Sequence, residues 1–153
     1  MFHGAPGGGK TSLAFAMAHL TNRNIFILNL SSLSNDVALA RCFKYLEQNS
    51  ILLIEDIDAA FVKRNDGEQV SFSMLLNCLD GAMSKEDIIT VITTNHVEKL
   101  DPALIRAGRI DLQVEIKYPS HIEVTEFLKN FYSDTSRNLK ILSILRIFKV
   151  YYC

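Results

Sequence analysis

The sequence has little of what would place it in several large classes of protein. Its three cysteines, Cys42, Cys78 and Cys153, are far apart and form no Cys-x-x-Cys pair. An odd number of distant cysteines argues against a disulfide framework and favours reduced thiols in a reducing compartment. The four histidines are scattered, which argues against a structural metal site. A formal net charge of -1 favours neither a nucleic-acid binder nor an acidic tail.

Long apolar runs are also missing from the sequence. None approaches the ~20 residues that a membrane-spanning helix requires. The most apolar stretch, residues 139–153, is interrupted by Lys140, Arg146 and Lys149. We therefore expect a core or interface helix there, or an abnormal chain end, before an anchor. No signal peptide precedes the first motif, because that motif begins at residue 4.

What the sequence does contain is an alternation of short apolar runs and longer amphipathic segments. This alternation predicts βα units on a parallel sheet, in a chain long enough for about one domain. We expect strands over residues 24–30, 51–56, 87–95 and 111–116, and helices from near Lys10 and over residues 34–48, 70–81, 101–108 and 122–133, with Ser34 or Asn35 as a cap and Gly81 as a stop. Continuously apolar strands indicate a sheet buried on both faces, and ligands of such sheets bind at the carboxyl ends of the strands.

A glycine-rich stretch near the start, GAPGGGKTS, fits the phosphate-loop pattern G-x-x-x-x-G-K-[ST] over residues 4–11. We expect Gly7, Gly8 and Gly9 to adopt positive φ and to turn their N–H groups inward as an anion nest. Lys10 would reach the β- and γ-phosphates of ATP, and the Thr11 hydroxyl would ligate Mg2+. The predicted nucleotide-binding residues are Gly4, Ala5, Pro6, Gly7, Gly8, Gly9, Lys10, Thr11 and Ser12. The alternative is a simple glycine-rich turn before a helix.

Acidic residues end the next apolar run, ILLIEDIDAAF. One carboxylate of the Glu55-Asp56 pair is predicted to orient Mg2+ and its water, and the other to polarise the water that attacks the γ-phosphate. By position Glu55 takes the metal side and Asp56 the water side. A slipped register with Asp56 near the metal stays open. Most strands of this kind end in Asp-Glu, so the reversed order in this chain is distinctive.

The stretch VITTNHVEKLDPALIRAGRID supplies a polar residue at a strand end and two arginines. Asn95 is placed to help position the lytic water. Arg106 and Arg109 suit the stabilisation of a transferring phosphoryl group, because a guanidinium is always charged and binds phosphate oxygens in a fork. Taken alone, these residues would be a turn cap and surface ion-pair partners. Their position after two nucleotide motifs favours the catalytic interpretation.

Four stretches together, GAPGGGKTS, ILLIEDIDAAF, LLNCLDG and TTNHVEKLDPALIRAGRID, resemble an AAA-type ATPase. More narrowly, the chain resembles the mitochondrial chaperone group that translocates the Rieske iron–sulfur protein during assembly of respiratory complex III. That group also carries Glu-Asp before the Ala-Ala-Phe and Thr-Thr-Asn-His before the arginines. The resemblance runs from about Gly4 to Tyr132.

The resemblance implies a P-loop αβα sandwich with a mostly parallel five-stranded sheet and a small helical lid. It implies Mg2+-dependent ATP hydrolysis, with ATP and Mg2+ as cofactors and Thr11 and Glu55 on the metal. It also implies a homo-oligomeric ring in which Arg106 and Arg109 act on the neighbouring subunit's ATP. By the same resemblance the client is an iron–sulfur protein and the location is the matrix side of the mitochondrial inner membrane. The net charge and the lack of a clear basic patch lead us to expect no nucleic-acid partner.

Both ends of the chain depart from that family. Only Met1, Phe2 and His3 precede the phosphate loop, which is short for a central strand. The family's transmembrane helix and N-terminal domain do not precede it, and residues 134–153 do not resemble the lid. We therefore expect an ATPase core domain over residues 1–133 and a divergent or truncated tail over residues 134–153, in a fragment, a misread gene model or a decayed copy.

Alternatives to a ring-forming ATPase remain at this level. The chain could be a non-catalytic nucleotide-binding fragment or regulatory module, which would bind ATP without turnover. A nucleotide kinase would have no use for the set of Asn95, Arg106 and Arg109, and a DNA-handling ATPase would favour basic patches. The loop over residues 29–37 lacks the aromatic residue that threading unfoldases carry, which fits the chaperone group or a plain solvated turn about equally.

Overall fold

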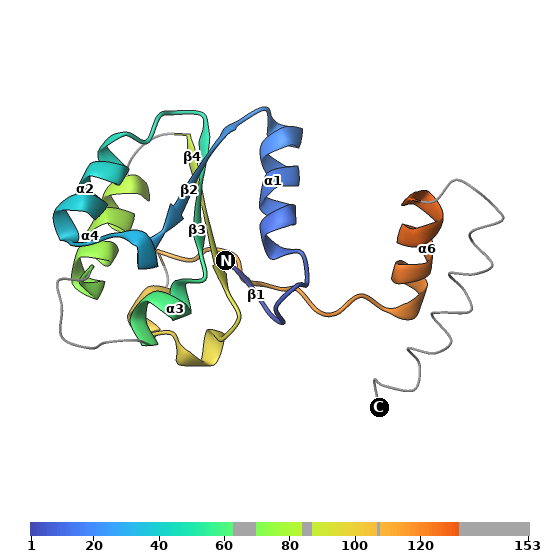
Figure 1. Ribbon diagram of the computed structural model, residues 1–153. Helices are drawn as coiled ribbons and strands as arrows, with labels where there is room; N and C mark the ends of the chain where they lie inside the picture. Colours follow the sequence, from blue (N-terminus) through green and yellow to red (C-terminus); the bar gives the residue numbers. More distant parts are fainter. Residues whose placement is uncertain (63–69, 84–86, 107, 132–153) are drawn as a thin grey trace. The chain divides into compact units, whose positions relative to one another are not determined.

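The structure is a computed structural model that describes residues 1–62, 70–83, 87–106 and 108–131 (Figure 1). The chain divides into two units, Met1–Lys117 and Tyr118–Cys153. The first unit holds a five-stranded parallel sheet of β1 (Phe2–His3), β2 (Asn24–Asn29), β3 (Ser50–Glu55), β4 (Ile88–Thr94) and β5 (Val114–Glu115). The strand order is β2-β3-β4-β1-β5. The predicted αβα class is confirmed.

Helices cover both faces of this sheet. Figure 1 shows α1 (Lys10–Thr21) on one face, with α2 (Asp36–Lys44) and α4 (Phe72–Met83) on the other. The side chains of β3 alternate between the two resulting cores: Leu52 and Ile54 face α2 and α4, whereas Ile51 and Leu53 face α1. All four are 2% exposed or less. The continuous apolar run therefore serves two faces of one buried sheet, as its composition predicted.

The first strand is short, yet it lies between two others. β1 has two residues and pairs in parallel with β4 on one side and with β5 on the other. A groove of about 540 Å³ lies beside it, lined mainly by residues 88–92 of β4 and residues 108–112. The Met1 ammonium donates to the Leu112 carbonyl at 2.6 Å, and burial lowers the pKa of this ammonium.

Several predicted boundaries are corrected by the structure. Gly81 does not stop α4, which continues to Met83 because Leu75, Leu79 and Ala82 on the same helix are buried. Helix α2 begins after its Asn35 cap, as predicted, but ends at Lys44 rather than near residue 48. Helix α5 (Pro102–Ile105) is capped by Asp101 and ends before Arg106, short of the predicted Gly108.

The α-helix that follows β3 was not predicted. Helix α3 (Ile57–Val62) follows β3 directly, because Asp56 adopts a left-handed φ of 45° that turns the chain sharply. The fully buried Ile57 then fixes the start of the helix. In the second unit α6 (His121–Phe131) confirms the predicted closing helix, and Ser120 and Glu123 cap it reciprocally. The predicted tail over residues 134–153 lies outside the described residues.

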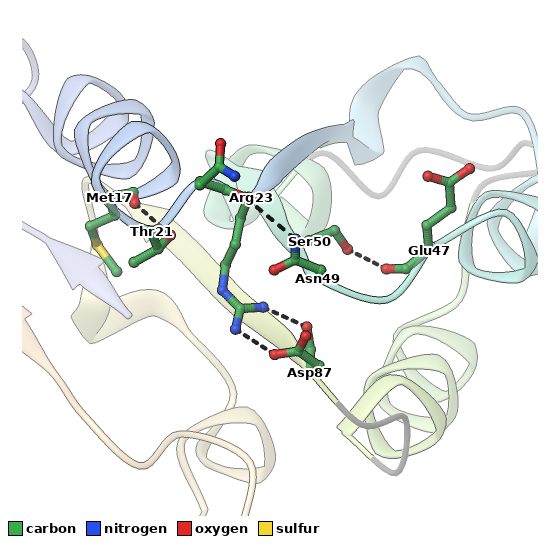
Figure 2. A network of polar contacts seen from close by, with 8 residues as sticks. Met17, Thr21, Arg23, Glu47, Asn49, Ser50 and Asp87 are labelled. Carbon is green, nitrogen blue, oxygen red and sulfur yellow. Dashed lines mark hydrogen bonds and ion pairs between the residues drawn. The ribbon is translucent and has the colours of Figure 1, made fainter.

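Turns at the amino ends of the strands use left-handed residues. Asn22, Asn49 and Asp87 have φ of 52°, 55° and 68° and precede β2, β3 and β4. Asparagine and aspartate tolerate this conformation better than most residues. Figure 2 shows Arg23 reaching across this end of the sheet to Asp87, where it donates to the carboxylate and to the backbone carbonyl. Among the described residues, no helix is long and apolar enough to cross a membrane.

Candidate functional site

The glycine-rich loop connects the end of β1 to the start of α1. Gly4, Gly7 and Gly9 have φ of 130°, 76° and 94°, which is the left-handed region that favours glycine. Gly8 was also expected to adopt positive φ, and the structure contradicts this. Its need for a small residue is instead one of space. A Cβ on Gly8 would lie 3.2 Å from the Ala5 carbonyl oxygen and 3.3 Å from a methyl carbon of Ile116.

Gly4 is held against the last strand of the sheet. A Cβ built on it would lie 2.2 Å from the Ile116 carbonyl oxygen, a distance that no side chain tolerates. The backbone N–H of Ile116 in turn donates to the His3 carbonyl at 2.7 Å. This bond holds Ile116 next to Gly4. Of the other predicted loop residues, Pro6 and Ser12 are exposed and Ala5 is half-buried.

Lys10 is the first residue of α1, and its side chain is directed back over the loop. Although charged, the residue is only 7% exposed. Its Nζ donates to the carbonyls of Gly4 and Ala5, both at 2.8 Å, and to Asn95 Oδ1 at 2.7 Å. Three acceptors compensate the burial of the ammonium. The contact with Asn95 joins the loop to the end of β4, 85 residues along the chain.

Thr11 and Glu55 meet between α1 and β3. The Thr11 hydroxyl donates to Glu55 Oε1 at 2.7 Å. A hydroxyl oxygen and a carboxylate oxygen are both ligands that Mg2+ prefers, and here they converge on one point. The two predicted metal ligands are therefore brought together by the fold. Within the described residues, no group of three or more His, Cys, Asp or Glu side chains is arranged to hold a metal ion.

Asp56 and Asn95 face each other across the ends of β3 and β4. Asn95 Nδ2 donates to Asp56 Oδ1 at 3.3 Å, while Asn95 Oδ1 accepts from Lys10. This orientation of the amide places its donor on the carboxylate and its acceptor on the ammonium, so both electrostatic contacts are favourable. Asp56 is exposed and Asn95 half-buried, which leaves the carboxylate open to solvent.

Three further polar residues connect these strand ends, and the sequence assigned no role to them. Thr93 Oγ1 accepts from the Asp56 amide at 3.1 Å. The buried Asp58 carboxylate accepts from the Thr94 hydroxyl at 2.6 Å and from the backbone N–H of Asn95 at 3.3 Å. The available signal was the third acid of the Glu-Asp-Ile-Asp stretch, together with the Thr-Thr-Asn that ends the next predicted strand.

The two predicted arginines have different surroundings. Arg109 forms a two-pronged ion pair with Asp80 of α4 at 2.8 and 2.9 Å, and also donates to the Ala103 carbonyl at 2.7 Å. Its hydrogen bonds lower the pKa of the Asp80 carboxyl, and the same bonds raise the pKa of Arg109. Arg106 is exposed, and within the described residues its side chain makes no hydrogen bond or ion pair. In that part of the chain neither arginine bonds to Lys10, Thr11, Glu55 or Asp56.

Comparisons with known proteins agree with this geometry. The family model of ATPases associated with various cellular activities (AAA) matches residues 1–118. The chain is 40% identical over 151 residues to the Homo sapiens protein named mitochondrial chaperone BCS1, covering 91% of this chain and 36% of that protein. It is 39% identical over 139 residues to the Schizosaccharomyces pombe protein named probable mitochondrial chaperone bcs1, covering 86% and 31%. The chain thus spans about a third of the length of these relatives.

Proposed function

This chain belongs to the AAA family of ATPases, and from that premise we propose that it binds ATP with Mg2+ and hydrolyses it. The observation that carries the proposal is the convergence of three side-chain contacts at the carboxyl ends of β1, β3 and β4. These are the contacts from Lys10 to Asn95, from Thr11 to Glu55 and from Asn95 to Asp56. Ligands of open parallel sheets bind at this edge.

The residues of the loop fit a triphosphate. The glycine-rich loop over residues 4–9 leads into the start of α1, and the free backbone N–H groups and the dipole of a helix N-terminus favour an anion. The Lys10 ammonium is already held at this position by three acceptors, so it would exchange them for phosphate oxygens without a large rearrangement. Thr11 and Glu55 would hold Mg2+. When bound, the ion supplies neutralisation of charge on the phosphate oxygens.

The residues at the end of β3 and β4 fit the activation of water. We assign the water-side role to Asp56, because its carboxylate is solvent-accessible and is held by the Asn95 amide. Glu55 takes the metal side, because its oxygen already contacts Thr11. Exchange of these two roles is the competing assignment, and the two differ by one methylene group in reach.

We further propose that the arginines act between subunits of a ring. Arg109 is oriented by Asp80, and Arg106 projects from the surface after α5. Since neither contacts the phosphate loop of its own chain within the described residues, a second copy of this chain is the natural recipient. An arginine supplied by a neighbour stabilises the charge on the transferring phosphoryl group.

The cellular role follows from the resemblance and the named relatives. We propose a chaperone on the matrix side of the mitochondrial inner membrane that moves a folded iron–sulfur protein during assembly of respiratory complex III. Supporting this proposal are the Glu55-Asp56 order, the Thr-Thr-Asn-His stretch and relatives that are named mitochondrial chaperones. The loop after β2, a short 3-10 helix over Leu30–Ser32 without an aromatic residue, suits a client that is not threaded through a narrow pore.

Measurement of ATP binding and turnover by the chain tests the proposed chemistry. We expect Mg2+-dependent turnover whose rate per molecule rises with protein concentration. Lys10→Ala should weaken ATP binding by about 10- to 100-fold, since a hydrogen bond to a charged group contributes about 1.5–3 kcal/mol. The exposed Lys44→Ala is the matched control. Asp56→Asn should bind ATP normally and lose turnover.

Each remaining outcome has a defined meaning. Retained turnover in Asp56→Asn, with turnover lost in Glu55→Gln, would exchange the roles of the two acids. Binding of ATP by the wild-type chain without turnover at any concentration would replace the enzyme by a non-catalytic nucleotide-binding module. Absence of binding would reject the nucleotide site itself.

A further inference from the structure

Asp58 is a buried carboxylate beside the proposed site, and the chemistry above gives it no task. It lies in the first turn of α3 and is 7% exposed. Burial of a carboxylate is unfavourable unless hydrogen bonds compensate it. One of its oxygens, Oδ1, accepts from the Thr94 hydroxyl at 2.6 Å and from the backbone N–H of Asn95 at 3.3 Å. Both donors belong to the end of β4.

These two bonds fix the position of the Asn95 backbone, from which its side chain extends. The Asn95 amide nitrogen is bonded to Asp58, and the preceding residue is bonded to the same oxygen through its side chain. The Thr94 hydroxyl also accepts from the His96 amide at 3.0 Å, which turns the chain away from the strand directly after Asn95. Asn95 therefore has fixed backbone on both sides.

The fixed backbone matters because the Asn95 side chain makes two opposite contacts. Its oxygen accepts from Lys10 and its nitrogen donates to Asp56. A displaced side chain would lose one contact or the other, since the two partners lie on different elements. The Asp56 amide is likewise bonded to Thr93 of β4. Four hydrogen bonds thus join Asp56 and Asp58 to the end of β4.

We infer that Asp58, together with Thr94, is a positioning residue of the ATPase reaction, which holds Asn95 in register with Asp56 and Lys10. The inference rests on the proposed function, because it assigns Asn95 a role in hydrolysis. Asp58 is expected to contact neither ATP nor the attacking water. Its effect is to keep the side-chain amide of Asn95 aligned with the Asp56 carboxylate, which orients the water.

The test compares two substitutions that each remove one half of the pair. Asp58→Asn keeps the size of the side chain and removes the ionised acceptor, and Thr94→Val keeps the shape and removes the hydroxyl. We expect each to lower kcat by about 10- to 100-fold, because misplacement of about 1 Å has effects of that size. We expect KM and the Kd for ATP to stay within about threefold, since Asp58 lies outside the phosphate loop.

Controls separate positioning from general loss of structure. Thr94→Ser keeps the hydroxyl and should retain turnover, and Thr90→Val makes the same chemical change elsewhere on β4. The side-chain NH2 resonance of Asn95, assigned with Asn95→Ala, should shift in both test variants and not in Thr90→Val. The double variant Asp58→Asn, Thr94→Val should be no slower than the slower single variant, because the two residues act through one contact.

Two results would overturn the inference for different reasons. Wild-type turnover combined with unchanged kcat and an unchanged Asn95 resonance in Thr94→Val would reject the positioning role alone. A wild-type chain without turnover would reject the proposed function and this role with it. If Asp58→Asn does not fold, the comparison of Thr94→Val with Thr94→Ser decides, and equal turnover in these two would count against the inference.

Discussion

The two ends of the parallel sheet are both rich in polar contacts, but the contacts differ in kind. At the carboxyl end, four hydrogen bonds join two side chains, from Lys10 to Asn95, Thr11 to Glu55, Asn95 to Asp56 and Thr94 to Asp58, in addition to bonds with the backbone. At the amino end, side chains bond mostly to backbone carbonyls near them, as with Asn49 to Asn22 and Ser50 to Glu47 (Figure 2).

This difference predicts different effects of substitution at the two ends of the sheet. A bond to a carbonyl depends on only one side chain, so a substitution there removes one contact and leaves the backbone to water. A bond between two side chains leaves a partner without its match, which is costly where the partner is buried. We therefore expect substitutions at the carboxyl end to alter both fold and turnover, and those at the amino end to alter stability alone.

The largest effect is expected from Gly4→Ala. The new Cβ would meet the Ile116 carbonyl oxygen at 2.2 Å, and φ of 130° is unfavourable for alanine. We expect a loss of more than about 3 kcal/mol in the free energy of unfolding, or no folded protein, because strain adds to the clash. Urea denaturation followed by circular dichroism measures it.

Gly7→Ala is the matched control for Gly4→Ala. Gly7 also has positive φ, at 76°, but nothing lies within 4 Å of its Cβ position. Strain alone should therefore act, with a loss of about 1–3 kcal/mol. Equal losses in the two variants would show that the close approach of Gly4 to Ile116 adds nothing to the strain of a positive φ.

The next effect concerns the two arginines, because Arg109 is held by hydrogen bonds and Arg106 is not. Arg106→Ala should lower turnover by about 10³-fold with little change in stability, since its exposed side chain makes no hydrogen bond or ion pair within the described residues. Arg109→Ala should lower turnover and also the midpoint temperature of unfolding, because Asp80 loses its partner. Steady-state ATPase assays and thermal unfolding measure both.

Mixing variants tests whether the arginines act between subunits. Arg106→Ala has an intact phosphate loop, and Lys10→Ala has intact arginines. A mixture should therefore recover part of the turnover that each variant lacks alone. No recovery over a range of ratios and concentrations would place Arg106 on the site of its own chain, or outside the reaction.

A smaller effect is expected at the amino end. Arg23 donates to the Asp87 carboxylate and carbonyl, with side chains 17% and 49% exposed. Arg23→Ala should reduce the free energy of unfolding by about 1 kcal/mol, the upper range for an exposed pair, and leave kcat and KM unchanged. Arg41→Ala on α2 is the control. A tenfold loss of turnover in Arg23→Ala would break the distinction between the two ends.

The smallest effect is the pH dependence of the pair between Arg109 and Asp80. The Arg109 hydrogen bonds hold the pKa of Asp80 below its ordinary 3.8. A depressed pKa means that the pair stabilises the fold above that value, and that the contribution is lost as pH falls through the lower folded value. The difference in midpoint temperature between wild type and Asp80→Asn should be constant from about pH 7 to 5 and shrink below about pH 4. A constant difference down to about pH 2 would contradict the assignment.

Much of the sheet could be predicted because its signals are local. The apolar run over residues 51–54 needs two buried faces wherever it lies, and the Asn35 and Asp101 caps mark helix starts by their own side chains. Gly81 and α3 could not be predicted in this way. The glycine is retained in α4 by the buried residues around it, and α3 depends on the left-handed φ of Asp56, a conformation that aspartate tolerates but does not require.

The sequence by itself determined the class of fold, the phosphate loop and the set of candidate residues, because spacing along one chain carries that information. Which residues meet was decided by the tertiary structure. Lys10 and Asn95 are 85 positions apart, and the contact between Thr94 and Asp58 joins the end of β4 to the first turn of α3 across 36 positions. The physical reason is that strand order, not chain order, brings the ends of β1, β3 and β4 to one edge. The same order gave Asp58 a place beside the site that its position in the sequence did not reveal.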